Sequence, residues 1–301
     1  MRVAPAIANA LAGGLPVVAL ESSVLAQGLP IPANREACER MLGAVERNGA
    51  VPAITAVVRG TPTVGLSGDD LERFLRREGV IKVAARDMAG AATQGLDGAT
   101  TVSASLVLAA AAGVRVFATG GIGGVHRDAP YDESADLLEL SRVSVICVCA
   151  GAKAILDLRA TAERLETLSV PVVGFGTDWL PEFYCEGASI PVSVRVDSAD
   201  QVARLYDRHK ALGMRGAVLV ANPPPEDTRL DRASVERAVS AAIAELKASG
   251  VEGKEVTPAL LASVERATGG RSLAANLALL ESNAALAARI AMALSAAEKN
   301  R

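Results

Sequence analysis

The sequence is poor in aromatic residues, in histidine and in the cysteine patterns that indicate a metal site or a disulfide framework. Only 3% of the 301 residues are aromatic although 50% are hydrophobic, so the core must be built from alanine, valine, leucine and isoleucine. Two histidines are too few for a histidine-rich metal site. Four cysteines without CxxC spacing are expected to be reduced and buried: Cys38, Cys147, Cys149 and Cys185.

The sequence also lacks an excess of charge and a targeting pattern. Residues 1–16 show no signal-peptide pattern, and we expect no apolar stretch of membrane-spanning length. The formal net charge of −3 at pH 7 argues against a broad nucleic-acid-binding surface. We therefore predict a cytoplasmic protein that binds a small molecule at a local site, and neither nucleic acid nor a membrane.

Short apolar runs alternate with amphipathic segments along the chain. We expect strands at 16–20, 53–58, 81–84, 114–119, 144–150, 170–175, 192–196 and 216–222, and helices near 34–48, 68–77, 101–112, 152–168, 199–212, 231–249, 257–268 and 272–296. This alternation predicts an α/β protein with a largely parallel sheet, forming a single domain over 1–301. Eight strands also leave a (β/α)₈ barrel open.

Polar and reactive residues follow several of the expected strands. Glu21 comes directly after the first strand, Lys82 lies in or at the end of a short one, and Lys153 follows "SVICVCA". Ligands of α/β sheets and barrels bind at the carboxyl ends of the strands. The clustering of these residues at strand ends therefore indicates an active site there.

The segment "GGIGGVHR" (120–127) has four glycines followed by His126 and Arg127. It is not a dinucleotide fingerprint, because His126 takes the place of the third glycine, and no Walker motif occurs. A glycine cluster alone is equally consistent with a flexible turn. The two basic residues favour an anion site in which backbone N–H groups contact a phosphate.

Acidic residues gather just beyond this segment. Asp132 and Asp136 are four residues apart, hence on one face if the segment is helical, and Asp128 and Glu133 lie beside them. Oxygen ligands of this kind suit Mg²⁺ or Mn²⁺. The simpler interpretation is a helix N-terminus, where carboxylates interact favourably with the dipole.

Lys153 and Glu21 are candidates for covalent and acid–base chemistry. A lysine is a nucleophile only as the free amine, which burial beside an apolar strand and the N-terminus of a following helix would both favour. Its alternative is a side chain that reaches solvent, and that of Glu21 is a salt bridge to an arginine. Together with an anion site, the pair fits Schiff-base chemistry on a sugar phosphate.

Several segments closely resemble the pseudouridine-5′-phosphate glycosidase family, whose members include indigoidine-synthase-A-like proteins. They include "ALESSVLAQGLPIPANREA", "GATTVSASLVLAAAAGVRVFATGGIGGVHR", "CAGAKAILDL", "GFGTDWLPEFY" and "TGGRSLAANLALLESNA", and they extend over nearly the whole chain. The resemblance implies a three-layer α/β/α sandwich with a largely parallel mixed central sheet, rather than a barrel, and a homotrimer.

The resemblance implies reversible cleavage of the C–C glycosidic bond of pseudouridine 5′-phosphate to uracil and ribose 5-phosphate, an activity classed with the hydro-lyases. The family's proposed route opens the ribose ring and forms an imine between a lysine and C1′, while protonation of uracil C5 lets the base depart. The matching motifs imply Lys153 as the nucleophile and Glu21 as the proton donor. Asp132 matches the residue that holds one Mn²⁺ per subunit, with Asp136 as the alternative direct ligand. Substrate contacts are implied for Lys82, Val102, Thr119, His126, Ser134, Ala135, Asp136 and Asn276.

The chain departs from the family pattern after Lys82, where Ala84 and Ala85 replace a serine and a basic residue of relatives. A kinase that makes the phosphorylated substrate would have to be a separate protein. Two alternatives stay open: another Schiff-base lyase acting on a sugar phosphate, and a nucleotide-binding protein with no catalytic activity.

Overall fold

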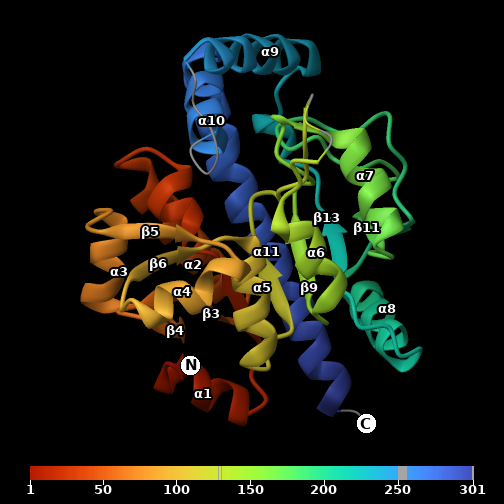
Figure 1. The fold of residues 1–301 in the computed structure, drawn as a ribbon. Helices are drawn as coiled ribbons and strands as arrows, with labels where there is room; N and C mark the ends of the chain where they lie inside the picture. Colours follow the sequence, from red (N-terminus) through yellow and green to blue (C-terminus); the bar gives the residue numbers. More distant parts are fainter. Residues whose placement is uncertain (128, 130, 250–255, 300–301) are drawn as a thin grey trace.

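Seven parallel strands form the centre of the molecule, in the order β3-β2-β7-β9-β13-β11-β12 (Figure 1). The structure is a computed structural model that describes residues 1–127, 129, 131–249 and 256–299. β2, β9 and β13 are buried along their whole length, as their unbroken apolar sequences require. The bounds are β2 Val17–Leu20, β3 Val51–Val58, β7 Val116–Ala118, β9 Ile146–Cys149, β11 Val172–Phe175, β12 Val194–Val196 and β13 Val218–Ala221.

An extension of the sheet continues beyond β3. Strands β4 (Thr61–Val64) and β6 (Asp97–Thr100) pair with β3 in antiparallel fashion, whereas β5 (Val80–Val83) runs parallel to β6. The short β1 (Arg2–Val3) lies parallel to β4 at the edge, opposite the β12 edge. The sheet thus has two ends, which excludes the barrel and confirms a mixed, largely parallel sheet.

All eight expected strands are present. β1, β4 and β6 were not expected, because Pro62 lies within β4 and Gly98 within β6, and both residue types are rare in strand interiors. Gly98 has a packing reason, since a Cβ there would collide with Val83 of β5. A separate pair, β8 (Val125–His126) and β10 (Leu156–Asp157), was also missed because each strand has only two residues.

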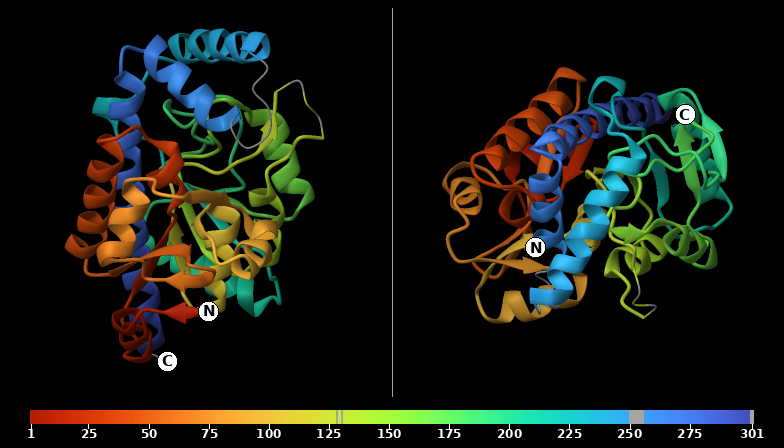
Figure 2. Two further views of the ribbon diagram at one scale, coloured as in Figure 1. Left: turned by 60° about the vertical axis from the view of Figure 1, so that its left-hand side comes forward. Right: turned by 90° about the horizontal axis from the view of Figure 1, so that it is seen from above.

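Helices cover both faces of the sheet (Figures 1 and 2). The last helix packs on β2, β7 and β9 with α2 and α8 beside it, while α5 contacts β2, β3 and β7 and packs on α6. This arrangement confirms the α/β/α layers. The bounds are α1 Pro5–Ala12, α2 Ala33–Arg47, α3 Gly68–Leu75, α4 Met88–Thr93, α5 Val102–Ala111, α6 Ala135–Arg142, α7 Leu158–Thr167, α8 Ala199–Ala211, α9 Arg232–Ser249, α10 Val256–Ala267 and α11 Arg271–Lys299, with short helical turns η1 Val24–Gly28, η2 Ala85–Asp87 and η3 Glu226–Thr228.

The start of α7 differs from expectation. The helix expected from residue 152 begins only at Leu158, where the Asp157 carboxylate accepts a hydrogen bond from the Ala160 N–H at 2.9 Å. Residues 152–157 form a turn and the strand β10 instead. Lys153 therefore precedes the helix by five residues and does not lie at its N-terminus.

Helix α11 reaches the length and hydropathy of a membrane span, contrary to the expectation that no segment would. It spans 29 residues, and 61% of its most apolar window is buried inside the protein. Its apolar composition has a structural cause, because the helix contacts three central strands and three other helices. A core helix of a globular protein meets the same criteria as a membrane span.

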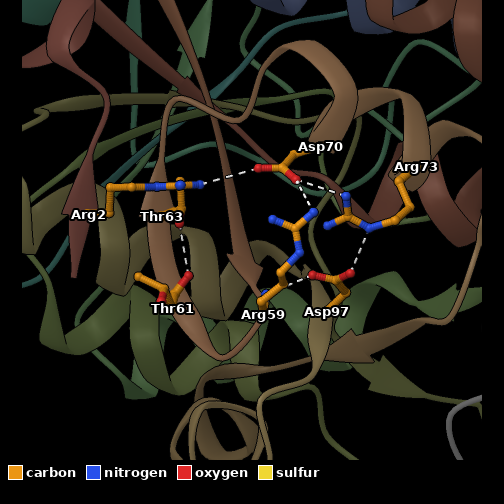
Figure 3. Close-up of polar contacts among 7 residues, drawn as sticks. All are labelled: Arg2, Arg59, Thr61, Thr63, Asp70, Arg73 and Asp97. Atoms are coloured by element: carbon orange, nitrogen blue, oxygen red, sulfur yellow. Dashed lines mark hydrogen bonds and ion pairs between the residues drawn. The ribbon is translucent and has the colours of Figure 1, made fainter.

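A network of ion pairs joins α3 to the antiparallel extension (Figure 3). Asp70 contacts the guanidinium groups of Arg73 at 2.8 Å, Arg59 at 3.3 Å and Arg2 at 3.6 Å. Asp97, at the start of β6, accepts hydrogen bonds from Arg73 Nε at 2.8 Å and from the Arg59 N–H at 2.7 Å. The hydrogen bond from Arg73 lowers the pKa of Asp70. The network thereby positions β6, which leads directly to the site described next.

Candidate active site

A cavity of about 310 Å³ opens at the carboxyl ends of the parallel strands. Glu21 enters it directly after β2, Thr119 directly after β7, and Lys153 from the turn that follows β9. Lys82 lines the cavity from β5. Glu21, Thr119 and Lys153 are far apart in the sequence, and the parallel arrangement of β2, β7 and β9 brings them to one edge of the sheet. Lys82 reaches the same cavity from β5, which runs antiparallel to these strands.

Ten of the eleven predicted site residues line this cavity: Glu21, Lys82, Thr119, His126, Asp132, Ser134, Ala135, Asp136, Lys153 and Asn276. Val102 does not. It is the first residue of α5 and is 1% exposed in the core, whereas its neighbours Thr101 and Ser103 do line the cavity.

The Glu21 carboxylate is buried, 4% exposed, and is oriented by two hydroxyl groups. Ser23 donates to one carboxylate oxygen and Thr119 donates to the other. Behind it, the Ser22 hydroxyl accepts a hydrogen bond from the Thr100 N–H at 2.9 Å. In the part of the chain that the structure describes, no arginine pairs with Glu21, so the salt-bridge alternative is wrong. The Thr119 hydroxyl, expected to contact the substrate, thus orients the Glu21 carboxylate.

Lys153 belongs to a tight turn at the end of a buried strand. Gly151 has φ +87°, a conformation that glycine adopts without strain, and starts this turn. The Lys153 N–H donates to the Ile122 carbonyl at 3.1 Å, and the Leu156 N–H donates to the Lys153 carbonyl at 3.0 Å. The side chain is partly buried and faces the cavity, and within the described ranges no hydrogen bond or ion pair engages its amine. This placement favours a reactive amine over a solvent-directed surface lysine.

The glycine loop is held closely by its neighbours. A Cβ at Gly123 would collide with the Ser134 hydroxyl and lie 2.9 Å from a carboxylate oxygen of Asp136. Two of the N–H groups expected to face a phosphate are used inside the protein: that of Ile122 donates to the Gly151 carbonyl at 3.1 Å, and that of Gly123 donates to Asp136 at 2.8 Å. The loop therefore offers fewer free N–H groups to an anion than the glycine pattern indicated.

Asp136 is 5% exposed and joins two parts of the site. One carboxylate oxygen accepts from the Ser103 N–H at 2.8 Å, at the start of α5, and the other accepts from the Gly123 N–H of the glycine loop. Both oxygens are thus engaged with the backbone. Asp132 lies outside the helix that contains Asp136, so the two do not share a helix face.

Asp132 has the only carboxylate of the acidic cluster that is free for a cation among the described residues. No hydrogen bond or ion pair engages its side chain there, whereas Glu133 pairs with Arg164 at 2.8 Å and Asp128 lies outside the described residues. No group of three histidine, cysteine or acidic side chains gathers anywhere in those ranges. One free carboxylate in the cavity fits a Mg²⁺-like or Mn²⁺-like ion that keeps several waters.

Helix α11 contributes amides that the sequence had only partly indicated. Asn276 lines the cavity as expected. Asn283, 1% exposed, was missed: its amide donates to the Thr119 carbonyl at 2.9 Å and the Gly120 carbonyl at 3.3 Å, and its oxygen accepts from Asn222 at 2.9 Å. Its position in the middle of an apolar helix could have indicated this role, because a buried amide requires hydrogen-bond partners.

The remaining walls are apolar and basic. Leu261 of α10 and Phe183 line one side. Arg86 and Ala84 line another side. Ala84 and Ala85 depart from the family pattern there, but the Arg86 guanidinium still provides a positive charge at that edge. Arg127, by contrast, does not line the cavity, and its side chain points to the turn that bears Lys153 and to α9. The expectation that it contributes to an anion site is wrong for this structure.

A family model described as "Indigoidine synthase A like protein" matches residues 6–293. A pseudouridine-5′-phosphate glycosidase of Gemmatimonas aurantiaca is 57% identical over 97% of this chain and 96% of its own length. The Escherichia coli (strain K12) protein of the same name is 45% identical over 97% of this chain and 94% of its own length.

Two solved structures share the fold over nearly the whole chain. The prealnumycin C-glycosynthase AlnA, crystallised with ribulose 5-phosphate, superposes with a TM-score of 0.91 at 41% identity, covering 99% of this chain and 98% of its own. An indigoidine synthase A-like protein of Thermotoga maritima gives 0.88 at 38% identity, covering 94% of both chains. The chain therefore belongs to the indigoidine synthase A-like family, in which its curated relatives are pseudouridine-5′-phosphate glycosidases.

Proposed function

We propose that this protein cleaves the C–C glycosidic bond of pseudouridine 5′-phosphate reversibly, giving uracil and ribose 5-phosphate. The observation that carries the proposal is the convergence of a lysine amine and a buried, oriented carboxyl group on one cavity. Bond cleavage at carbon needs both, because the sugar carbon requires an electron-donating partner and the departing uracil carbon requires a proton.

The Lys153 amine forms a bond to C1′ while the C1′–O4′ bond breaks and O4′ takes up a proton. The nitrogen lone pair then forms the C=N bond of an imine as the electron pair of the C1′–C5 bond moves to uracil C5. Glu21 supplies the proton that C5 receives. Water adds to the imine, releases ribose 5-phosphate and regenerates the amine. The sum consumes one water, so the reverse reaction loses water, in agreement with a hydro-lyase class.

Substrate binding is assigned to the side chains around these two groups. Lys82 and His126 provide basic groups for the phosphate, and Asn276 provides an amide for the opened sugar. Asp132 would hold the Mn²⁺, one per subunit, and the ion would supply positive charge against the phosphate. Ser134 and Ala135 form the wall between this carboxylate and the glycine loop.

The deciding experiment measures uracil release from pseudouridine 5′-phosphate, with uridine 5′-phosphate as the matched substrate. We expect release from the first and none from the second. Borohydride in the presence of ribose 5-phosphate should attach the sugar to Lys153, and Lys153→Ala should give no adduct. Activity retained in Lys153→Ala, with no adduct in the wild type, would disprove the imine route.

The metal assignment has a test of its own. Titration calorimetry should detect Mn²⁺ binding to the wild type and not to Asp132→Asn, and chelation by EDTA should abolish turnover until Mn²⁺ is added back. Glu163→Gln, an exposed carboxyl group outside the cavity, is the control. Equal Mn²⁺ binding by wild type and Asp132→Asn would refute the assignment.

A second candidate follows from the AlnA likeness. A C-glycosynthase solved with ribulose 5-phosphate shares 41% of its residues with this chain, so the same lysine could act on a sugar phosphate with another aglycone. Failure to release uracil, combined with a ribose 5-phosphate adduct at Lys153, would favour this candidate. We further propose that the protein is cytoplasmic and that it forms a homotrimer. Light scattering at micromolar concentration tests the homotrimer directly.

A further inference from the structure

The turn that bears Lys153 depends on few backbone contacts. The Lys153 N–H donates to the Ile122 carbonyl, and the Leu156 N–H donates to the Lys153 carbonyl. At the end of the turn, Leu156 of β10 pairs with His126 of β8. No helix stabilises it, because α7 begins only at Leu158. The carbonyls of Ala154 and Leu156 both accept hydrogen bonds from one arginine.

Arg127 binds both of these carbonyls. Its Nη2 donates to Ala154 at 3.2 Å and its Nε donates to Leu156 at 3.2 Å. The side chain is 24% exposed, so water competes weakly for these donors. A planar guanidinium can hold two carbonyls at a fixed spacing, which a single ammonium group cannot do.

The other edge of the same guanidinium binds α9. Glu236 accepts from Nη1 at 2.5 Å and from Nη2 at 3.0 Å. At its start, α9 is fixed by Arg232, which pairs with Glu182 at 2.9 Å, and by the Leu230 N–H, which donates to Tyr184 at 2.9 Å. Arg127 is thus a third point of attachment, along the body of the helix.

Helix α9 packs on α10, and α10 supplies a wall of the cavity. The two helices are joined by Arg266 and Glu245 at 3.0 Å, and Ser263 donates to the same carboxylate. Leu261 of α10 lines the cavity. Figure 2, viewed from above, shows this helix pair lying across the end of the molecule. We call α9 and α10 the cover.

We infer that Arg127 is a positioning residue that joins the Lys153 turn to the cover, and that it does not bind the substrate phosphate. The inference rests on the proposed function insofar as Lys153 is the nucleophile. One edge of the guanidinium fixes the two carbonyls that flank Ile155 and thereby the position of the Lys153 amine. The other edge anchors the cover through Glu236.

The two contacts can be separated by mutation. Arg127→Lys keeps the charge but cannot span both carbonyls, so kcat and the rate of borohydride-trapped adduct should both fall by about 10²-fold, the cost of a small misplacement, with little change in KM. Glu236→Ala leaves the turn contacts in place, so it should raise KM and leave the trapping rate within about threefold.

The reversed pair Arg127→Glu with Glu236→Arg restores the cover contact only. It should return KM toward the wild type while kcat stays low, because a carboxylate cannot donate to the carbonyls. Arg195→Ala, an exposed arginine paired with Asp178 and Asp197 away from the cavity, is the control and should behave as the wild type.

The outcome that overturns the inference is a normal kcat in Arg127→Lys together with a raised KM and weaker inhibition by inorganic phosphate, which would make Arg127 a phosphate ligand. Hydrogen exchange supplies a readout that does not need the proposed reaction. Residues 152–157 should exchange faster in Arg127→Lys but not in Glu236→Ala. A wild type that releases no uracil would reject the proposed function and leave this exchange test to decide whether Arg127 holds the turn.

Discussion

Replacing Asn283 with alanine is expected to damage stability and activity together. The change removes an amide that donates to the Thr119 and Gly120 carbonyls and accepts from Asn222. Gly120 keeps a partner, because its carbonyl also accepts from the Ala150 N–H at 2.9 Å. Asn222 likewise keeps its contact with Ser282 at 3.1 Å, so among the described residues the Thr119 carbonyl alone is left without a partner.

The magnitude follows from this accounting. One buried carbonyl without a partner costs about 1–3 kcal/mol, and the space left by the amide adds roughly 1 kcal/mol. We therefore expect the free energy of unfolding to fall by about 2–4 kcal/mol. The Thr119 hydroxyl orients Glu21, so a shift of this residue should also lower kcat by about tenfold, or ~1.4 kcal/mol in activation free energy.

Urea unfolding and uracil release measure the two effects. Asn48→Ala is the matched control, since the Asn48 amide donates to the Ala44 carbonyl at 2.8 Å at the C-terminal end of α2, a helix that does not line the cavity. It should cost less than about 1.5 kcal/mol and leave kcat unchanged. If Asn283→Ala unfolds at the wild-type urea concentration, or loses stability with normal kcat, the reasoning is wrong.

Three further predictions concern single positions. Gly123→Ala should lower the melting temperature more than Gly213→Ala, because its Cβ would collide with neighbours whereas Gly213 has open space and only a positive φ; equal shifts would contradict this. Burial raises the pKa of Asp97, but hydrogen bonds, chiefly from Arg73, outweigh burial and lower it. The ionised Asp97 carboxylate should therefore stabilise the fold above about pH 4 and lose this contribution as the pH falls below about 4. Asp97→Asn should accordingly flatten the dependence of the free energy of unfolding on pH in that range. Burial raises the pKa of Cys38 to about 12, so iodoacetamide at pH 8 should label it only after denaturation, and rapid labelling of native protein would disagree.

The central strands could be predicted because their composition is unambiguous. Runs such as "SVICVCA" are too apolar and too rich in β-branched residues for a loop or a surface helix. The antiparallel extension could not, since Pro62 and Gly98 are unfavourable in strands and are tolerated only through their neighbours. Local propensity cannot report a contact such as that between Gly98 and Val83.

The site shows the same division. That Glu21 and Lys153 meet follows from the rule that parallel strands end at one edge, whereas Lys82 comes from β5, which runs antiparallel to these strands, and its approach does not follow from that rule. The partners of Thr119 and Arg127 do not follow from any rule, because they depend on which side chains lie within hydrogen-bonding distance after folding. Arg127 lies in the segment that indicated an anion site and Thr119 directly precedes it, and both form contacts inside the protein: Thr119 donates to Glu21 and Arg127 donates to the Leu156 carbonyl.

Helix α11 has a consequence for the order of events during synthesis. It is synthesised long after β2, β7 and β9, yet it packs on all three. Until it arrives, the Thr119 carbonyl lacks its amide and one face of the central strands is uncovered. A nascent chain that ends before residue 271 would therefore expose the apolar face of these strands, which favours aggregation.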